Sequence, residues 1–598
     1  MSRHKSRRRV RAKPPGGIAA YLHPRTPDAY WKWLPALLAA AFALRAAIAL
    51  SGDFVIHPDE IMQYLEQAHR LVFGSGVVYW EYFYGARSWL VPGLAAGALW
   101  ICKILGLDSP TYYIGAAKLL FCAISLLIPW GMYVFSRRHW GESTARIALL
   151  AGVFWYELAG FAHKPMTEFV ATSVLLALLA AAPLSPGEHW RRYAAAGALG
   201  ALLVAVRFQY APAAALILLA GFWRGDKNAK AAMFGGALAT TAAVGILEWL
   251  SWGAPFYSYY FNARMNLIVG AGRAGESSLL HMPVWLLHAG GGLILTAVYG
   301  AAKNFRRRGF VASLILLILI PHMLQNHREY RFIFALIPLW LLLSADVVAV
   351  FAAGLRRPAA AKIVAAAAFA IVSVAGIFNA IPWQQYIYTG FSRETGRVNF
   401  VAGQDPIFAI YRRLGADPDV RGVADFTRPY FNTGGYYYLH HSVPFYDSHS
   451  WARLADENAA VYVSHIITDK TADAGGEVSA VRGADGNIVQ ILRTDNGAIP
   501  LPVFAAENGR LMYWNKLGDK RALGEYETDA RIGDFILWKL KTRTPVREWR
   551  NYEIFAAGGL EQVAEIITNG KAAPPPEKYG IVFYSDSAAD ANGKTPPQ

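Results

Sequence analysis

The sequence predicts a multi-span α-helical membrane protein that carries a soluble, mixed α/β domain towards its C-terminal end. Hydrophobic residues make up 55% of the 598 residues and charged residues only 17%, which is low for a soluble globular protein. Several apolar runs of about 17 to 25 residues are each long enough to cross a bilayer as a helix. After about residue 391 these runs cease, and Asp, Asn, Gly and aromatic residues become common.

Clusters of Lys and Arg separate the apolar runs. Of the net charge of +16, seven Lys or Arg fall in the first thirteen residues, and five further basic connections separate later runs. This distribution follows the positive-inside rule, and the basic clusters lack the interleaved aromatic residues that stack on nucleic-acid bases. We therefore place a basic arm, residues 1–33, and the basic connections in the cytoplasm, and we predict no nucleic-acid partner.

Eleven spans follow if the basic connections stay on one side. The transmembrane domain is predicted to cover residues 34–390, with an outer loop over 51–110. Residues 88–106 are apolar enough to span, but counting them would reverse the basic connections, so we predict a helix in the outer interface beside a helix over 59–73. The predicted spans are 34–50, 111–135, 146–162, 169–184, 193–206, 210–223, 231–250, 283–302, 309–325, 332–351 and 361–381.

Eleven spans leave the C-terminal region on the non-cytoplasmic side, as a soluble domain over residues 391–570. The segments VYVSHIIT, NIVQILRT and DFILWKLK alternate or cluster like strands. Residues 571–598 are rich in Pro, Gly and polar residues and are predicted to form a mobile tail.

The same topology gathers short polar motifs on the outer face. Charges near the membrane are costly, so they tend to face a cavity and act there. The motifs come from six separate connections, and we predict that they converge on one outer cavity. They are HPDE (57–60), WEYFYGARS (80–88), HKPMTE (163–168), RFQY (207–210), the loop 248–266 and NHREYRF (326–332).

The adjacent acids of HPDE have two compatible interpretations. Pro58 is favoured at the first position of a helix, and Asp59 and Glu60 suit the positive end of its dipole, so the motif can simply start a helix. The same helix start can hold a carboxylate rigidly at a cavity mouth, where it takes a proton from an acceptor hydroxyl as general base.

The cations of the outer motifs also have two interpretations. Arg328 and Arg331 are three residues apart, on one face of a helical turn, and guanidinium groups suit phosphate oxygens. Alternatively they reach towards lipid headgroups from a short hairpin. Lys164 and Arg207 either join this cationic group or are structural charges at the interface.

No metal or cofactor is predicted. His440, His441, Asp447 and His449 offer metal-binding side chains, but their spacing matches no established metal pattern. The sequence has no nucleotide-phosphate loop and no dinucleotide-binding fingerprint.

Together the motifs resemble family 22 glycosyltransferases, which are mannosyltransferases of the GT-C fold. The run HPDEIMQYLEQAHRLVFG followed by YWEYFYGARSWLVPG resembles the family's first outer loop, and HKPMTE, VRFQY, GAPFYSYYFN and HREYRFIFALIPL agree with it in order and in side. The resemblance covers about residues 34–345. Arg328 stands where Lys is usual, Glu248 stands where Asp is expected, and the region after 391 has no clear match.

The resemblance implies inverting transfer of a sugar, above all mannose, from a polyprenyl-phosphate or dolichyl-phosphate donor to a hydroxyl of a glycan or glycolipid, without a cofactor. Asp59 is then the general base, and Glu60 positions the acceptor or tunes Asp59. Because two nearby carboxylates repel, one pKa of the pair is expected to rise. The donor phosphate is expected to contact Arg328, Arg331, Lys164, Arg207 and His327. The substrates are expected to contact His57, Trp80, Glu81, Tyr82, Arg87, Glu168 and Asn262.

Three alternatives stay open at this point. One is another GT-C transferase, moving aminoarabinose, glucose or an oligosaccharide to lipid A, protein or polymer. Another is a transporter of lipid-linked sugars, although the inverted repeats common in transporters are not evident, and the third is a non-catalytic scaffold. The expected location is the bilayer of a bacterial inner membrane, with the site facing the periplasm or exterior.

Overall fold

The computed structural model describes most of the helical region and part of the C-terminal region. Nearly all of the predicted arm, 1–33, and the whole predicted tail, 571–598, lie outside the described residues. Those described are 32–264, 278–290, 292–325, 328–355, 358–378, 400–401, 406–427, 433–443, 445–446, 463–469 and, between 477 and 541, the strands with a few adjoining residues.

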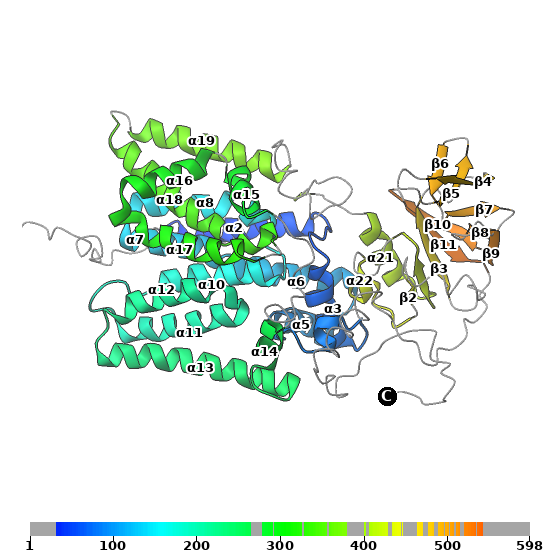
Figure 1. Ribbon diagram of the computed structural model, residues 1–598, viewed down its shortest axis with the longest axis horizontal. Coiled ribbons are helices and arrows are strands. Elements are labelled where there is room, and N and C mark those ends of the chain that lie inside the picture. The colour runs from blue at the N-terminus through cyan, green and yellow to red at the C-terminus, as the bar shows by residue number, and fades with distance from the viewer. Residues whose placement is uncertain are drawn as a thin grey trace, which may run out of the picture.

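A bundle of apolar helices fills one half of the molecule (Figure 1). Their sequences are rich in Ala and Leu, the residues that favour helices most, and every predicted span overlaps at least one of them. In chain order they are α2 (Leu34–Leu50), α6 (Pro110–Ser125), α7 (Leu127–His139), α8 (Glu142–Phe154), α10 (Thr167–Ala181), α11 (Trp190–Val206), α12 (Ala211–Phe222), α13 (Lys227–Trp252), α15 (His281–Gly290), α16 (Gly292–Lys303), α17 (Phe305–Met323), α18 (Leu336–Ala353) and α19 (Pro358–Ile377).

Three of the described helices are long and apolar enough to cross a membrane, namely α6 with α7 as one unit, α13 and α18. A fourth would be α15 with α16, but these two meet at 103° and do not form the straight span predicted over 283–302. The sequence has three consecutive glycines at 290–292, and glycine is a poor helix former. Among the described residues no other helix is both long and apolar enough, so the number of eleven spans stays a prediction.

The predicted span 146–162 is interrupted. Helix α8 ends at Phe154, and α9 (Tyr156–Gly160) begins after Trp155, whose ψ of 125° is not helical. The buried guanidinium of Arg45 in α2 donates to the carbonyl oxygens of Gly152 at 2.8 Å and Val153 at 3.2 Å. These bonds satisfy carbonyls that the end of α8 leaves without helical partners.

Close backbone contact joins α11 and α13. A Cβ atom at Gly197 would lie 1.9 Å from the carbonyl oxygen of Met233, and one at Gly236 would lie 2.1 Å from that of Ala194. Only glycine fits at both positions, in agreement with the small residues found where membrane helices approach closely.

The outer loop folds into short helices at one end of the bundle (Figure 1). They are η1 (Glu60–Leu65), α3 (Glu66–Phe73), α4 (Trp80–Phe83) and α5 (Leu90–Ile104). Helix α5 packs against η1, α3 and α6, which confirms the predicted contact of 88–106 with the helix over 59–73. Its position in the membrane interface stays a prediction.

The C-terminal region combines strands and helices, as predicted. A five-stranded mixed sheet has the order β10-β11-β3-β1-β2, in which β1 pairs in parallel with β2 and β3. The three predicted strand segments are confirmed as β3 (His465–Asp469), β5 (Ile488–Thr494) and β11 (Phe535–Leu540). The other strands of this sheet are β1 (Val423–Asp425), β2 (Phe445–Tyr446) and β10 (Tyr526–Ile532).

Two further sheets are antiparallel, β4-β5-β6 and β7-β8-β9. Helices α21 (Pro406–Ala416) and α22 (Gly435–Leu439) lie between the five-stranded sheet and the outer loop (Figure 1). The boundaries predicted at 390 and 570 stay predictions. The remaining strands are β4 (Glu477–Arg482), β6 (Gly497–Pro500), β7 (Val503–Glu507), β8 (Arg510–Trp514) and β9 (Lys520–Gly524).

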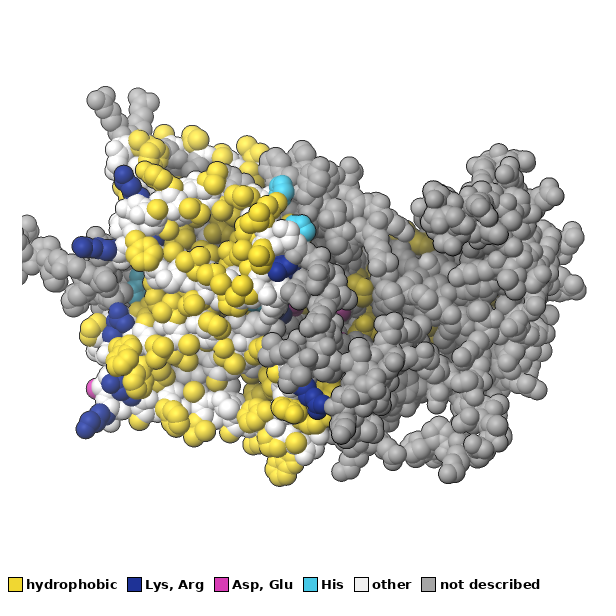
Figure 2. All heavy atoms as spheres, viewed as in Figure 1, with side chains coloured by type: hydrophobic (Ala, Val, Ile, Leu, Met, Phe, Trp, Pro, Cys, Tyr) yellow, Lys and Arg dark blue, Asp and Glu magenta, His cyan; other side chains and the backbone are white. Residues whose placement is uncertain are grey.

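Charge is distributed unevenly along the bundle. Lys and Arg side chains gather at the end remote from the sheets, while hydrophobic side chains cover its flank (Figure 2). The outer loop lies at the opposite end (Figure 1). The arrangement agrees with basic connections on one side and polar motifs on the other; which side is cytoplasmic stays a prediction.

Candidate active site

The HPDE motif starts a helix, as the local interpretation predicted. The carbonyl oxygen of Pro58 accepts the N–H of Ile61 at 3.1 Å, and the N–H of Asp59 donates to Nδ1 of His57 at 3.2 Å. Residues Glu60–Leu65 then form a π-helical segment, a wider turn that is frequent at functional sites.

The two adjacent acids bind different cations. Asp59 Oδ2 accepts a hydrogen bond from Arg331 at 2.7 Å, whereas Glu60 Oε1 accepts one from Lys164 at 2.9 Å. Lys164 is only 1% exposed, and its ammonium also donates to the carbonyl oxygen of Phe54. The pair therefore divides into a partly exposed Asp59–Arg331 contact and a buried Glu60–Lys164 contact.

The electrostatics of Asp59 differ from the prediction. Burial alone would raise the pKa of Asp59, but the positive charge of Arg331, joined by that of His57 whenever its imidazole is protonated, outweighs burial and holds that pKa well below its usual range. Close to Asp59, the pKa of Glu81 is raised. Burial raises the pKa of Glu81 more than Arg87 lowers it, and the charge of Asp59 adds to the rise.

Opposite charges alternate in a chain that runs away from Asp59, and we call it the charge ladder. His57 Nε2 lies 3.6 Å from Glu329 Oε2, and Glu329 forms a close ion pair with Arg331. Arg331 Nε lies 3.9 Å from Glu168 Oε1, which in turn accepts Arg207 at 2.9 Å. The predicted residues His57, Glu168, Arg207 and Arg331 are thus brought together.

A buried anchor fixes the turn that carries Arg331. This residue lies in η5 (Tyr330–Ile333), and the hydroxyl of Tyr330 donates to Glu157 Oε1 at 2.5 Å. The other carboxylate oxygen of Glu157 accepts Trp155 Nε1 at 3.1 Å, and Glu157 is fully buried. The interruption between α8 and α9 therefore places an acid where it holds η5.

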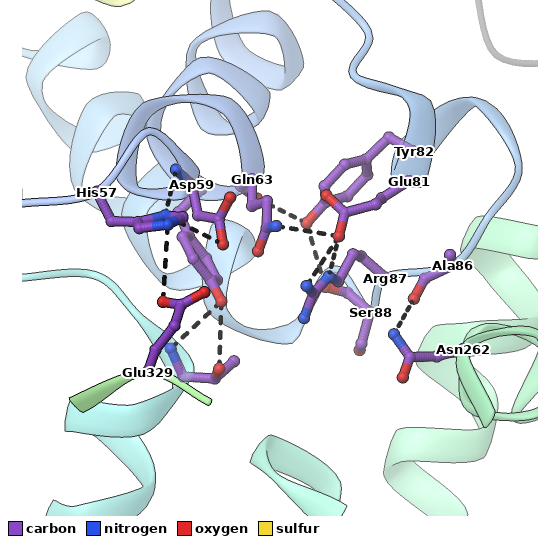
Figure 3. A network of polar contacts seen from close by, with 12 residues as sticks. His57, Asp59, Gln63, Glu81, Tyr82, Ala86, Arg87, Ser88, Asn262 and Glu329 are labelled. Carbon is purple, nitrogen blue, oxygen red and sulfur yellow. Dashed lines mark hydrogen bonds and ion pairs between the residues drawn. The ribbon is translucent and has the colours of Figure 1, made fainter. Parts of the chain in front are cut away.

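A second polar group faces Asp59 along η1 (Figure 3). Glu81 Oε1 accepts Gln63 Nε2 at 3.0 Å and two hydrogen bonds from Arg87, at 3.0 and 2.8 Å. The hydroxyl of Tyr82 donates to the backbone carbonyl of Gln63 at 2.8 Å. Arg87 is 31% exposed, so its guanidinium is more accessible than that of Arg331, at 6%.

A cavity of about 80 Å³ opens beside these groups. Its walls come from the outer loop, the start of α10, the segment from the end of α11 through η2 (Phe208–Tyr210), and α14 (Tyr257–Ala263). Two arginines and several hydroxyl and amide groups lie among otherwise apolar walls, the composition expected of a ligand site. The polar lining comprises Tyr64, Tyr82, Arg87, Ser88, Thr167, Arg207, Gln209, Ser258, Tyr259 and Asn262.

Other predicted residues are placed as follows. Asn262 lines the cavity, and its amide donates to the carbonyl oxygen of Ala86 at 3.0 Å (Figure 3). Arg328 donates through Nε to a backbone carbonyl at the end of α17, 2.8 Å away. The side chain of Trp80 and the whole of His327 lie outside the described part of the chain.

Sequence reasoning missed several site residues. Glu329 lies inside a motif that was singled out, yet only His327, Arg328 and Arg331 of that motif were considered. Glu157 is a lone acid in an apolar run, a signal that by itself suggests a role. Gln63, Tyr64 and Thr167 carry no comparable signal, because uncharged polar residues are ordinary in a helix.

Similarity to solved structures identifies the fold. The crystal structure of ArnT from Cupriavidus metallidurans in the apo state matches with a TM-score of 0.50 at 12% identity, covering 85% of this chain and 97% of that one. At this identity the likeness concerns the fold alone, and it confirms a GT-C-type helical fold.

The model of the Alg9-like mannosyltransferase family matches residues 36–440. This stretch is more than half of the chain and includes the outer loop and the charge ladder. The chain belongs to the Alg9-like mannosyltransferase family, which confirms the resemblance to family 22 glycosyltransferases, and it is a mannosyltransferase.

Individual relatives agree with this family. GPI mannosyltransferase 3 of Yarrowia lipolytica is 27% identical over 369 residues, covering 58% of this chain and 68% of the relative. The enzyme of the same name from Drosophila melanogaster is 33% identical over 120 residues, covering 19% of this chain and 21% of the relative. Both relatives are eukaryotic, so the bacterial setting gains no support from them and stays a prediction.

Proposed function

We propose that the protein transfers mannose from a polyprenyl-phosphate-linked donor to a hydroxyl group of a glycan or glycolipid acceptor, with inversion at the anomeric carbon and Asp59 as general base. The observation that carries the proposal is the position of the cavity. Of its two arginines, Arg87 is paired with Glu81, and Arg207 is paired with Glu168 of the charge ladder, which leads through Arg331 to Asp59. A substrate in the cavity therefore meets two cations next to the network that holds Asp59.

The reaction requires one proton to leave the acceptor. The acceptor oxygen attacks the anomeric carbon from the face opposite the phosphate, and its proton passes to the carboxylate of Asp59. The bond from the anomeric carbon to the phosphate oxygen breaks, and its electron pair stays on the phosphate. Because Arg331 holds the pKa of Asp59 low, this carboxylate is ionised throughout the neutral range.

The departing lipid phosphate needs positive charge rather than a general acid. Arg87 and Arg207 both line the cavity, and guanidinium groups stabilise phosphate oxygens as charge develops. Lys164 faces Glu60 in a buried pair and Arg331 is engaged with Asp59. We therefore assign the phosphate to Arg87 and Arg207, and positioning roles to Lys164, Glu60 and Arg331.

The polar lining offers groups for sugar hydroxyls. Asn262 and Gln209 carry amides, and the Tyr82 and Tyr259 rings border the same space, where aromatic faces can stack on a sugar. The relatives are named GPI mannosyltransferase 3, so a glycolipid of the GPI type is the first acceptor to test. A GT-C transferase specific for another sugar is the second candidate.

The test compares purified wild type, Asp59→Asn and Asp419→Asn, a matched change at an exposed position of the C-terminal region. Each is given polyprenyl-phosphate mannose labelled in the sugar together with lipid extract from the native host. We expect transfer by wild type and Asp419→Asn, and a fall of roughly 10²- to 10⁴-fold in Asp59→Asn with donor binding retained. Full transfer by Asp59→Asn would place the base elsewhere.

The same assay, repeated with other lipid-phosphate sugars as donors, separates the alternative functions. Transfer from another lipid-phosphate sugar, but not from mannose, would contradict the donor assignment while keeping the reaction class. If no sugar is transferred while labelled donor crosses the bilayer of reconstituted vesicles, the proposed reaction fails and transport takes its place.

A further inference from the structure

His57 stands between two carboxylates at the edge of the site (Figure 3). Its Nδ1 lies 3.4 Å from Asp59 Oδ2, and its Nε2 lies 3.6 Å from Glu329 Oε2. The N–H of Asp59 donates to Nδ1 at 3.2 Å, so in this geometry Nδ1 carries a lone pair. The ring hydrogen of the neutral imidazole is then on Nε2, which faces Glu329.

Asp59 is poorly suited to keep a proton. Its carboxylate accepts a charged hydrogen bond from Arg331 at 2.7 Å, and protonation would weaken that bond. An imidazole ordinarily binds a proton more tightly than a carboxylate, by roughly 2 to 3 pKa units. A proton that reaches Asp59 therefore has a better acceptor beside it in the Nδ1 lone pair.

We propose that His57 is the second proton acceptor of the transfer step, receiving at Nδ1 the proton that Asp59 takes from the acceptor hydroxyl. This inference rests on the proposed function, because it needs Asp59 to act as the base. As the proton reaches Nδ1, the hydrogen bond that Nδ1 accepts from the backbone N–H of Asp59 breaks. Asp59 returns to its ionised form, and the imidazolium lies between Asp59 and Glu329, with Nδ1 facing Asp59 and Nε2 facing Glu329. The Nε2 proton then leaves through Glu329 to water, so one proton is released for each sugar transferred.

The surroundings of His57 suit this transient charge. Asp59 and Glu329 face its two nitrogens, and Arg331 binds both carboxylates, which holds them on either side of the ring. Arg87 acts on Asp59 from the cavity side. The side chains of His57 and Glu329 are 22% and 16% exposed, so the proton has a route to solvent.

The role differs from that of a substrate ligand, which the sequence suggested for His57. A ligand that binds the substrate and the transition state equally changes KM, whereas a proton acceptor that acts in the reaction changes kcat. It also differs from a purely structural role at the start of η1, which small bases in solution cannot replace.

The experiment uses the full-length enzyme and the variants His57→Gln and Glu329→Gln, with His189→Gln as matched control. The amide that replaces the imidazole in His57→Gln keeps an oxygen that can accept the N–H of Asp59. His189 is exposed and caps α11, away from the cavity lining. Steady-state kcat and donor KM are measured from pH 5 to 9, with and without added imidazole.

For His57→Gln we expect kcat to fall by roughly 10²-fold, the scale of general acid–base catalysis, with donor KM within about twofold. Added imidazole restores part of the rate, and the acid side of the pH–rate profile flattens. Glu329→Gln lowers kcat less, since water can still take the proton from Nε2.

Three results would overturn the proposal. The first is a raised KM with unchanged kcat in His57→Gln. The second is a loss of kcat in His57→Gln that imidazole does not restore and that accompanies a lower melting temperature. The third is a fully active His57→Gln. In the last case an inactive Asp59→Asn would leave the proposed function standing and remove only the second acceptor. An active Asp59→Asn would remove both.

Discussion

Glu66 is a fully buried carboxylate that joins the outer loop to the C-terminal region. Its Oε1 accepts the N–H of Tyr436 at 3.2 Å and of Val77 at 2.9 Å, and its Oε2 accepts the N–H of Tyr437 at 3.0 Å. Two of these donors belong to α22, about 370 residues further along the chain. Replacing Glu66 by Gln therefore tests how α22 is held.

The magnitude follows from the bonds that are lost. A hydrogen bond to a charged group contributes about 1.5–3 kcal/mol, so the two from α22 give roughly 3–6 kcal/mol. The amide introduced by Glu66→Gln would keep one oxygen acceptor but turn an NH₂ group towards a backbone N–H. We expect about half of the contribution to disappear, roughly 1.5–3 kcal/mol, which is a factor of about 10 to 150 in the equilibrium between docked and undocked α22.

Amide hydrogen exchange measures this equilibrium at the two N–H groups of α22 that donate to Glu66. In Glu66→Gln the amides of Tyr436 and Tyr437 are expected to exchange faster by the same factor, because local opening exposes them. Glu142→Gln, at a partly exposed position with ion pairs to Arg137 and Arg146, is the matched control. Exchange at these two amides within about threefold of wild type would refute the reasoning and assign the docking to other contacts.

Three further predictions concern neighbouring groups. Burial would raise the pKa of Asp53, but the charges of Lys118 and Arg412 outweigh burial and lower that pKa. The ion pairs of Asp53 therefore stabilise the fold fully above about pH 4, and this stabilisation is lost as the pH falls through the folded-state pKa. In Asp53→Asn, the free energy of unfolding is expected to fall less steeply with decreasing pH. Arg331→Lys keeps the charge but not the fork, and kcat is expected to fall roughly tenfold, about 1.4 kcal/mol, in the transfer assay; an unchanged kcat would contradict this. Tyr330→Phe leaves the buried Glu157 without its hydroxyl donor and is expected to cost about 1.5–3 kcal/mol, seen as a lower melting temperature.

Much of the fold was predictable because membrane helices are encoded locally. Continuous apolar runs sufficed to place the helices from α2 to α19, and alternation sufficed for β3, β5 and β11. The bends were harder to predict. Three consecutive glycines in the sequence give a local signal for the bend between α15 and α16. The break at Trp155 depends on Arg45 of another helix, which supplies the missing hydrogen bonds. The sequence of α8 and α9 alone does not reveal Arg45, because this residue belongs to α2.

The site was predictable as a set of motifs but not as a set of pairs. Asp59, Arg331, Arg207 and Glu168 were each singled out, and they lie in one ladder. The division of the acids between Arg331 and Lys164 was missed, because adjacent residues in a helix point in different directions. Sequence adjacency suggested repulsion between Asp59 and Glu60, whereas the fold provides a separate cation for each.

The charge ladder also constrains how a donor phosphate binds. Arg207 is paired with Glu168 and Arg87 with Glu81, so neither cation is an isolated charge that awaits an anion. Leaving the buried Arg207 unpaired would be costly without substrate, and Glu168 avoids that cost. A guanidinium has five hydrogen-bond donors and can share them between a carboxylate and a phosphate. The ammonium of Lys164, which is buried in its ion pair with Glu60, is less able to bind both at once. The arrangement therefore favours Arg at the two positions that line the cavity and tolerates Lys where the contact is only structural.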